Sequence, residues 1–147
     1  MKPYRKNQPL ALWLLFILLL LTGCGGAEPE CDSLDSHNSV VRIISDDSNN
    51  ALVNYAVRNS GSVAAMVSNT NTEAEKSAIL EKARQGAVYR LDDTILTNSR
   101  NRATRAVTCS GLLYVTVGDT IAQKQVDFKV ERTTDGRMSV SVDPFLF

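Results

Sequence analysis

The side chains best suited to catalysis in this chain are its single histidine, His37, and its three cysteines, Cys24, Cys31 and Cys109. A catalytic triad requires a serine or cysteine nucleophile and an acid that converge on the histidine. The chain contains no G-x-S-x-G motif, which positions such a nucleophile in many hydrolases. We therefore expect His37 to be a surface or capping residue, and we expect the protein not to be an enzyme.

A second group with potential chemistry is the oxygen-rich run Asp-Asp-Ser-Asn-Asn at positions 46–50. An EF-hand loop also needs a glycine and a later glutamate at fixed positions, and neither follows this run. The sequence contains no glycine-rich loop of the kind that binds phosphate. We therefore expect a solvated segment here, with neither a metal nor a cofactor.

Two further features could contact a partner. The basic cluster Arg100, Arg102 and Arg105 suits an acidic protein or anionic lipid headgroups, but it also suits the solvated turn of a β-hairpin. The apolar end of the sequence, Phe145-Leu146-Phe147, either packs against the end of a sheet or forms an exposed contact site. The sequence leaves both alternatives open for each feature.

The N-terminal segment has the organisation of a signal peptide. Three basic residues in the first six positions precede an apolar run from Leu10 to Leu21, and a short small-residue segment follows. A helix over this run would be about 18 Å long, whereas a bilayer core is about 30 Å thick. The run is therefore too short for a simple transmembrane span, although an uncleaved anchor and an ordinary secretory signal remain alternatives.

The motif Leu21-Thr22-Gly23-Cys24 resembles the lipobox of bacterial lipoproteins, in which the cysteine is lipidated and becomes the first mature residue. The resemblance implies a signal peptide over 1–23, acyl chains such as palmitate on Cys24, and stable membrane anchoring. The residue after Cys24 is Gly25 and not an aspartate. This resembles the pattern of Gram-negative lipoproteins that are sorted to the periplasmic face of the outer membrane. Residues 24–30 would form a flexible tether and residues 31–147 a single periplasmic domain.

Lipidation of Cys24 would leave Cys31 and Cys109 as a pair in an oxidising compartment. We predict a disulfide between them, with two buried free thiols as the alternative; once they are paired, one histidine cannot complete a zinc site. Removal of the leader takes away three basic residues and no acidic one. The mature chain then has 13 Lys and Arg against 16 Asp and Glu, a net charge of −3. Such a weakly acidic domain argues against a nucleic-acid partner.

The first half of the domain has helical periodicity. Apolar residues recur at helical intervals between Val40 and Ala56, which predicts either one helix over about 37–58 with a polar waist or two shorter helices. Residues 59–61 should end this segment, and residues 62–72 should form a short apolar patch and a loop. Thr72 and Glu75 form a capping-box pattern that predicts a helix from residue 73 to residue 85, closed by Gly86.

From Val88 onward the apolar residues alternate, which predicts four antiparallel strands. The first should run from 88 to 97, the second from 104 to 117, the third from 121 to 132, and the fourth from 138 to the residues before Pro144. The expected turns lie at 98–102, 118–120 and 134–136. The predicted fold class is α+β, with N-terminal helices packed on a four-stranded antiparallel β-meander.

The cysteine, helix and strand arrangement of residues 31–136 resembles that of small Gram-negative periplasmic lipoproteins, including types that serve in conjugative exclusion or toxin immunity. The segments that carry this loose resemblance are 107–115, 126–131 and 134–136. It implies a membrane-anchored lipoprotein whose domain binds another envelope protein. The alternative is a carrier of a small apolar ligand, with a cavity between helices and sheet lined by Tyr89, Leu113 and Phe128.

Overall fold

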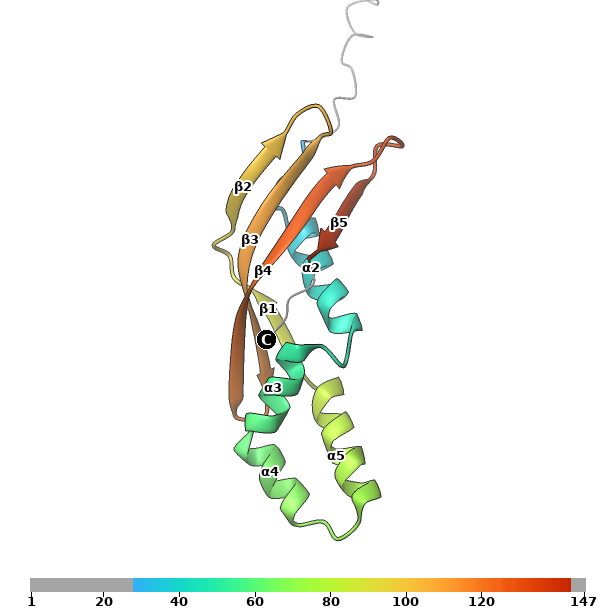
Figure 1. Cartoon of the computed structure of the whole chain (residues 1–147), viewed down its shortest axis with the longest axis vertical. Helices are drawn as coiled ribbons and strands as arrows, with labels where there is room; N and C mark the ends of the chain where they lie inside the picture. The colour runs from blue at the N-terminus through green and yellow to red at the C-terminus, as the bar shows by residue number, and fades with distance from the viewer. Residues whose placement is uncertain (1–27, 144–147) are drawn as a thin grey trace, which may run out of the picture.

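The computed structural model of the chain describes residues 28–143, so the leader, Cys24 and the apolar end Phe145–Phe147 lie outside the described residues. Within this range the chain forms an elongated α+β domain (Figure 1). Its helices are α2 (Leu34–Asp46), α3 (Ala51–Asn59), α4 (Gly61–Ser68) and α5 (Glu73–Gln85). Its strands are β1 (Val88–Leu91), β2 (Leu96–Asn101), β3 (Ala106–Val117), β4 (Thr120–Arg132) and β5 (Met138–Val142).

The first helical segment is two helices, because the polar residues 46–50 in its middle end α2 and begin α3. Asn50 lies before α3 with an extended backbone, and its side-chain oxygen accepts a hydrogen bond from the Val53 N–H at 2.9 Å. The side-chain amide of Asn50 donates to the carbonyls of Ile44 and Asp47 near the end of α2. One buried side chain thus caps one helix and satisfies the end of the other.

The sheet is antiparallel, with strand order β1-β3-β4-β5, and β2 also pairs with β3. The single first strand predicted over 88–97 is wrong, because the segment is divided into β1 and β2 at residues 92–95. The predicted turn at 98–102 is also wrong, because 98–101 belong to β2 and the turn follows at 102–105. The pairing of this fully exposed edge strand with β3 contains a register shift between Thr97 and Ser99.

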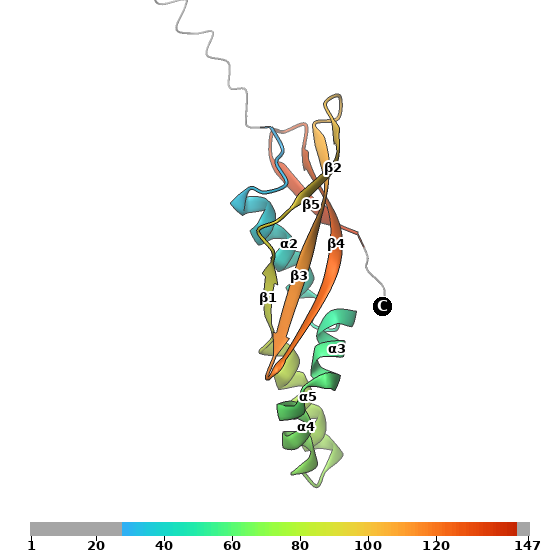
Figure 2. The ribbon, with the colours of Figure 1, turned by 90° about the vertical axis from the view of Figure 1, so that its left-hand side faces the viewer.

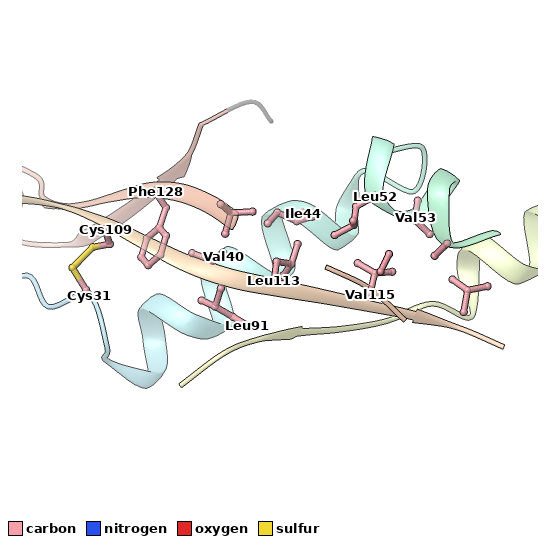
Figure 3. Close-up of a cluster of buried hydrophobic side chains, with 14 of the residues drawn as sticks. Cys31, Val40, Ile44, Leu52, Val53, Leu91, Cys109, Leu113, Val115 and Phe128 are labelled. Carbon is pink, nitrogen blue, oxygen red and sulfur yellow. A yellow bond between two sulfur atoms is a disulfide. The ribbon is translucent and has the colours of Figure 1, made fainter. Parts of the chain in front are cut away.

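The long hairpin of β3 and β4 forms the centre of the sheet, paired from Ala106 with Glu131 to Val117 with Thr120. Strand alternation gives the two faces different characters. The inner face, which α2 and α3 contact, buries side chains of both strands. The buried apolar side chains of this hairpin on the inner face include Val107, Cys109, Leu113, Val115, Val117, Ala122, Val126, Phe128 and Val130. Figure 3 shows part of this core, in which Val40 and Ile44 of α2 and Leu52 and Val53 of α3 lie against the strands.

The remaining helices do not cover the sheet. The apolar patch predicted before residue 68 is helix α4, and Ser60 both ends α3 and caps α4 by accepting from the Val63 N–H at 3.3 Å. The predicted helix over 73–85 is confirmed as α5, and Thr72 caps it by accepting from the Glu75 N–H at 3.2 Å. Both helices extend past the β3–β4 turn (Figures 1 and 2). We call this part the helical end. We call the opposite part, which contains residue 28 and the β2–β3 and β4–β5 turns, the turn end.

Candidate functional site

The predicted disulfide between Cys31 and Cys109 is confirmed, and it joins residues 78 positions apart. Cys109 lies on the inner face of β3, opposite Phe128 of β4 and Thr97 of β2. Cys31 lies three residues before the start of α2, and its sulfur accepts a hydrogen bond from the Thr97 hydroxyl at 3.3 Å. Both cysteines are buried, and the Cα atoms lie 5.8 Å apart. The bond therefore fixes the start of the domain to the central strand (Figure 3).

A second contact fixes the chain just before the disulfide. Arg100 lies opposite Val107 in the sheet register, on the same side as Cys109. Its guanidinium group lies 3.4 Å from the carboxylate of Glu28 and donates to the Pro29 carbonyl at 3.2 Å. Arg100, expected as a contact for an outside partner, is therefore engaged by the chain's own N-terminal segment. Spacing along the sequence gave no signal for this contact, because the two sides are about 70 residues apart.

Arg102 and Arg105 occupy the β2–β3 turn at the turn end, and both are exposed. The side-chain oxygen of Asn101 accepts from the N–H groups of Ala103 and Thr104, which holds the backbone of the turn. Arg105 has a φ of 48° and its carbonyl accepts from the Arg132 N–H at 3.0 Å, which attaches the turn to β4. The structure thus presents two of the three predicted arginines on one four-residue turn whose backbone is held by hydrogen bonds.

The helical end carries apolar side chains that the fold does not bury. In the apolar helix α4 only Val63 is buried, and the Met66 side chain is 50% exposed. Val88 and Ile121 each pair with Thr116 in the register, so they flank it on the outer face of the sheet. They are 64% and 67% exposed. Met66 on α4 and the pair Val88 and Ile121 on the sheet are exposed apolar side chains that the sequence did not single out.

The β3–β4 turn holds the helical end through one carboxylate. Asp119 accepts from the Ser60 hydroxyl at 2.7 Å and from the Ser62 hydroxyl and N–H, both at 3.1 Å. These hydrogen bonds, that of Ser60 first, lower the pKa of Asp119 to about 2. Gly118 has a φ of 56°, and an added Cβ would lie 2.3 Å from the Ser62 hydroxyl oxygen, so the close approach requires glycine. The contact joins the sheet to the N-terminus of α4.

A hollow of about 510 Å³ lies at the turn end, between the start of α2 and the ends of β4 and β5. Most of its lining residues are polar or charged, namely Glu28, Glu30, Ser33, Asp35, Ser36, Asn38, Ser39, Arg42, Arg132, Met138 and Val140. His37 is not among them; it is half-buried in α2, and its Nε2 atom has no hydrogen-bond partner within residues 28–143. In the same range, no group of three or more His, Cys, Asp and Glu side chains could hold a metal ion.

The residues named for a ligand cavity are packed instead. Leu113 is 0% exposed and Phe128 is 2% exposed, both within the core (Figure 3). Tyr89 is half-buried; its hydroxyl accepts from the side-chain amide of Asn50 at 3.0 Å, and burial raises its pKa. None of the three lines the hollow at the turn end. These positions therefore do not favour the carrier alternative.

The chain was compared with protein-family models, with curated proteins and with solved structures, and none of the three comparisons finds a match. The lipobox residues and the apolar run before them lie outside the described residues. Within the described part, no helix has the length and apolar character needed to cross a bilayer.

Proposed function

We propose that this protein is a lipoprotein of the Gram-negative envelope, anchored through Cys24 to the periplasmic face of the outer membrane, whose domain binds another envelope protein. The observation that carries the binding role is the apolar surface of the helical end. Met66, Val88 and Ile121 are each at least half exposed, although the same fold buries eighteen apolar side chains in one core. Leu34 and Leu96 are also exposed elsewhere, but α4 is an apolar helix in which only Val63 is buried, and exposed apolar surface of this kind favours a protein contact.

The anchoring role is supported by the sequence Leu21-Thr22-Gly23-Cys24 and by the disulfide. Disulfides persist in oxidising compartments such as the periplasm, and they are rare in the cytosol. The disulfide is consistent with export, and export is what the N-terminal segment predicts. Conjugative exclusion, toxin immunity and an accessory role in an envelope complex are all compatible with such a tethered domain that binds a protein.

The anchor is tested by replacing the cysteine that would carry the lipid. A Cys24→Ser variant should lose labelled palmitate, shift in electrophoretic mobility and leave the membrane fraction. Cys24 lies outside the folded part, so the change should leave the Cys31–Cys109 disulfide intact, and a thiol titration checks this. A variant that still fractionates with membranes and shows no mobility shift would contradict the proposed anchor.

The binding role is tested by crosslinking in cells through a photoreactive residue in place of Ala65, which is exposed on α4. We expect one discrete crosslinked protein, and we expect Met66→Asp to remove it. Leu34→Asp is the matched control, because Leu34 is also apolar and is 74% exposed on α2 near the turn end. Recovery of the monomer alone, or loss of the product in both variants, would count against a partner site at the helical end.

A further inference from the structure

We propose that the β2–β3 turn, through Arg102 and Arg105, docks on anionic phospholipid headgroups and holds the domain with its helical end away from the membrane. This inference rests on the proposed anchoring at Cys24. The partner is the membrane surface that the anchor would bring close to the turn. The argument begins from the point at which the chain leaves the domain toward Cys24.

The exit point of the tether is fixed at the turn end by a disulfide and by the contacts of Arg100. Cys31 is covalently joined to Cys109, which lies three residues after the start of β3. Arg100 holds Glu28 and Pro29 against β2. Figures 1 and 2 both show the first described residues at the end of the molecule where the β2–β3 turn lies. The direction in which the chain continues toward Cys24 is therefore constrained near these contacts.

The tether is too short to move the turn end far from the anchor. Cys24 precedes Glu28 by four residues, and four extended residues span at most about 14 Å. Arg102 follows Arg100 by two residues, which is about 7 Å along an extended strand. Since Arg100 contacts Glu28, the arginines of the turn lie within a few tens of ångströms of the headgroups, whichever way the tether bends. α4 and α5 lie at the opposite end of the domain, farther from the tether (Figures 1 and 2).

The turn carries positive charge that the described part of the protein does not neutralise. Within residues 28–143 the ion pairs do not include Arg102 or Arg105. The acidic side chain nearest along the sheet register is Glu131, opposite Ala106, and it is paired with Lys129. Because the backbone of the turn is fixed by Asn101 and by the contact with β4, the two guanidinium groups are presented with little loss of backbone freedom.

Closeness to the proposed anchor favours the membrane over a soluble acidic protein as the partner of this turn, since both partners match its positive charge. Exposed charges act over about 8 Å at physiological ionic strength, and the anchor brings the turn repeatedly into that range. Each arginine near an anionic surface contributes about 1 kcal/mol, which is about a fivefold change in the docked population. Two arginines would therefore change the ratio of docked to undocked domains by about 25- to 30-fold.

The test uses the lipidated full-length protein reconstituted into vesicles of phosphatidylcholine, with or without phosphatidylglycerol, and with nickel chelated to a fraction of the headgroups. A nitroxide-bearing non-natural residue replaces Ala103 in the turn or Asn69 at the helical end. We expect nickel to relax the nitroxide at position 103 strongly when phosphatidylglycerol is present, and to leave position 69 unaffected. High salt should remove the difference.

The double variant R102Q/R105Q should lose the phosphatidylglycerol dependence at position 103. The matched control is R58Q/K82Q, which removes two exposed cations from α3 and α5. Equal relaxation of position 103 in both kinds of vesicle, or relaxation of position 69, would overturn the proposed docking. An unchanged lipid signal combined with loss of the crosslinked protein in R102Q/R105Q would instead assign the turn to an acidic protein.

The mass of the purified protein distinguishes failure of the proposed anchor from failure of the proposed headgroup contact. If the mature chain carries no acyl chains, the proposed anchoring is wrong, and sedimentation of the same protein with phosphatidylglycerol vesicles then measures the arginine contact alone. Sedimentation that depends on Arg102 and Arg105 would support the contact. Absence of sedimentation would overturn it.

Discussion

The two ends of this domain are stabilised in different ways. From the turn end to its middle, α2 and α3 bury apolar side chains against the sheet, and a disulfide crosslinks the first residues to β3. At the helical end, α5 has no buried residue and α4 has only Val63. The contact between this end and the sheet includes hydrogen bonds to one exposed carboxylate, that of Asp119. The comparison indicates that global stability resides in the sheet, while the helical end contributes surface.

The largest expected effect comes from removing the crosslink. A C31S/C109S variant should unfold with a free energy lower by about 4 kcal/mol, because the bond closes a loop of 78 residues in the unfolded chain. Urea denaturation followed by far-UV circular dichroism measures this change. The oxidised wild type and the reduced wild type are the controls, and the variant should match the reduced protein. Equal stability of all three would show that the turn end does not depend on the crosslink.

The second prediction uses the same substitution in both regions. Leu113→Ala removes a fully buried side chain of β3, and it should cost about 3 kcal/mol. Leu80→Ala removes a half-buried side chain of α5, and it should cost roughly 1 kcal/mol or less. Denaturant midpoints at an unchanged m-value measure both. Similar losses in the two variants would break the distinction between a stabilising sheet and a peripheral helical end.

The smallest effect on global stability should come from Asp119→Asn, and it should be confined to the helical end. The variant keeps the shape of the side chain but removes the negative charge that accepts from Ser60 and Ser62. Amide hydrogen exchange in α4 should become faster, while exchange in β3 and β4 stays unchanged. Asp93→Asn, at an exposed loop position, is the matched control. Faster exchange throughout the sheet would show that the two regions unfold together.

The same contact predicts a pH dependence with a definite sign. The pKa of Asp119 is lowered from 3.8 to about 2, so the folded state binds a proton less readily than the unfolded state. The carboxylate therefore stabilises the helical end fully above about pH 4, and the stabilisation is lost as the pH falls toward 2. The amide resonances of Ser62 and Val63 report this transition, and Asp119→Asn should abolish it.

The parts of the fold that the sequence predicted are those where one local pattern determines the structure. Alternation indicated the buried faces of β3 and β4, the Thr72 and Glu75 pair indicated the start of α5, and Gly86 indicated its end. Because Cys24 was assigned to the lipid, Cys31 and Cys109 remained as the pair that predicted the disulfide. For the strands and the helix, the residues that define the element lie in it or next to it. For the disulfide, only two cysteines remained, so only one pairing was possible.

The parts that were not predicted depend on contacts between distant residues or on positions with two roles. β2 has no buried residue, so it lacks the alternation that identifies a strand, and its pairing with β3 defines it. Ser60 looks like a helix stop, but it also caps α4. The contacts of Arg100 with Glu28 and of Asp119 with Ser60 join residues far apart in the sequence, and no spacing rule identifies them.

The position of the disulfide on β3 has a mechanical consequence. A tension applied between residue 28 and the helical end enters the sheet at Cys109, near one end of β3. It is then carried along the β3–β4 hairpin, whose paired residues must shear together to give way. The hydrogen bonds of Asp119 lie at the other end of this path, and far fewer bonds share the load there. A pulling partner would therefore detach α4 from the sheet before it stretched the sheet itself.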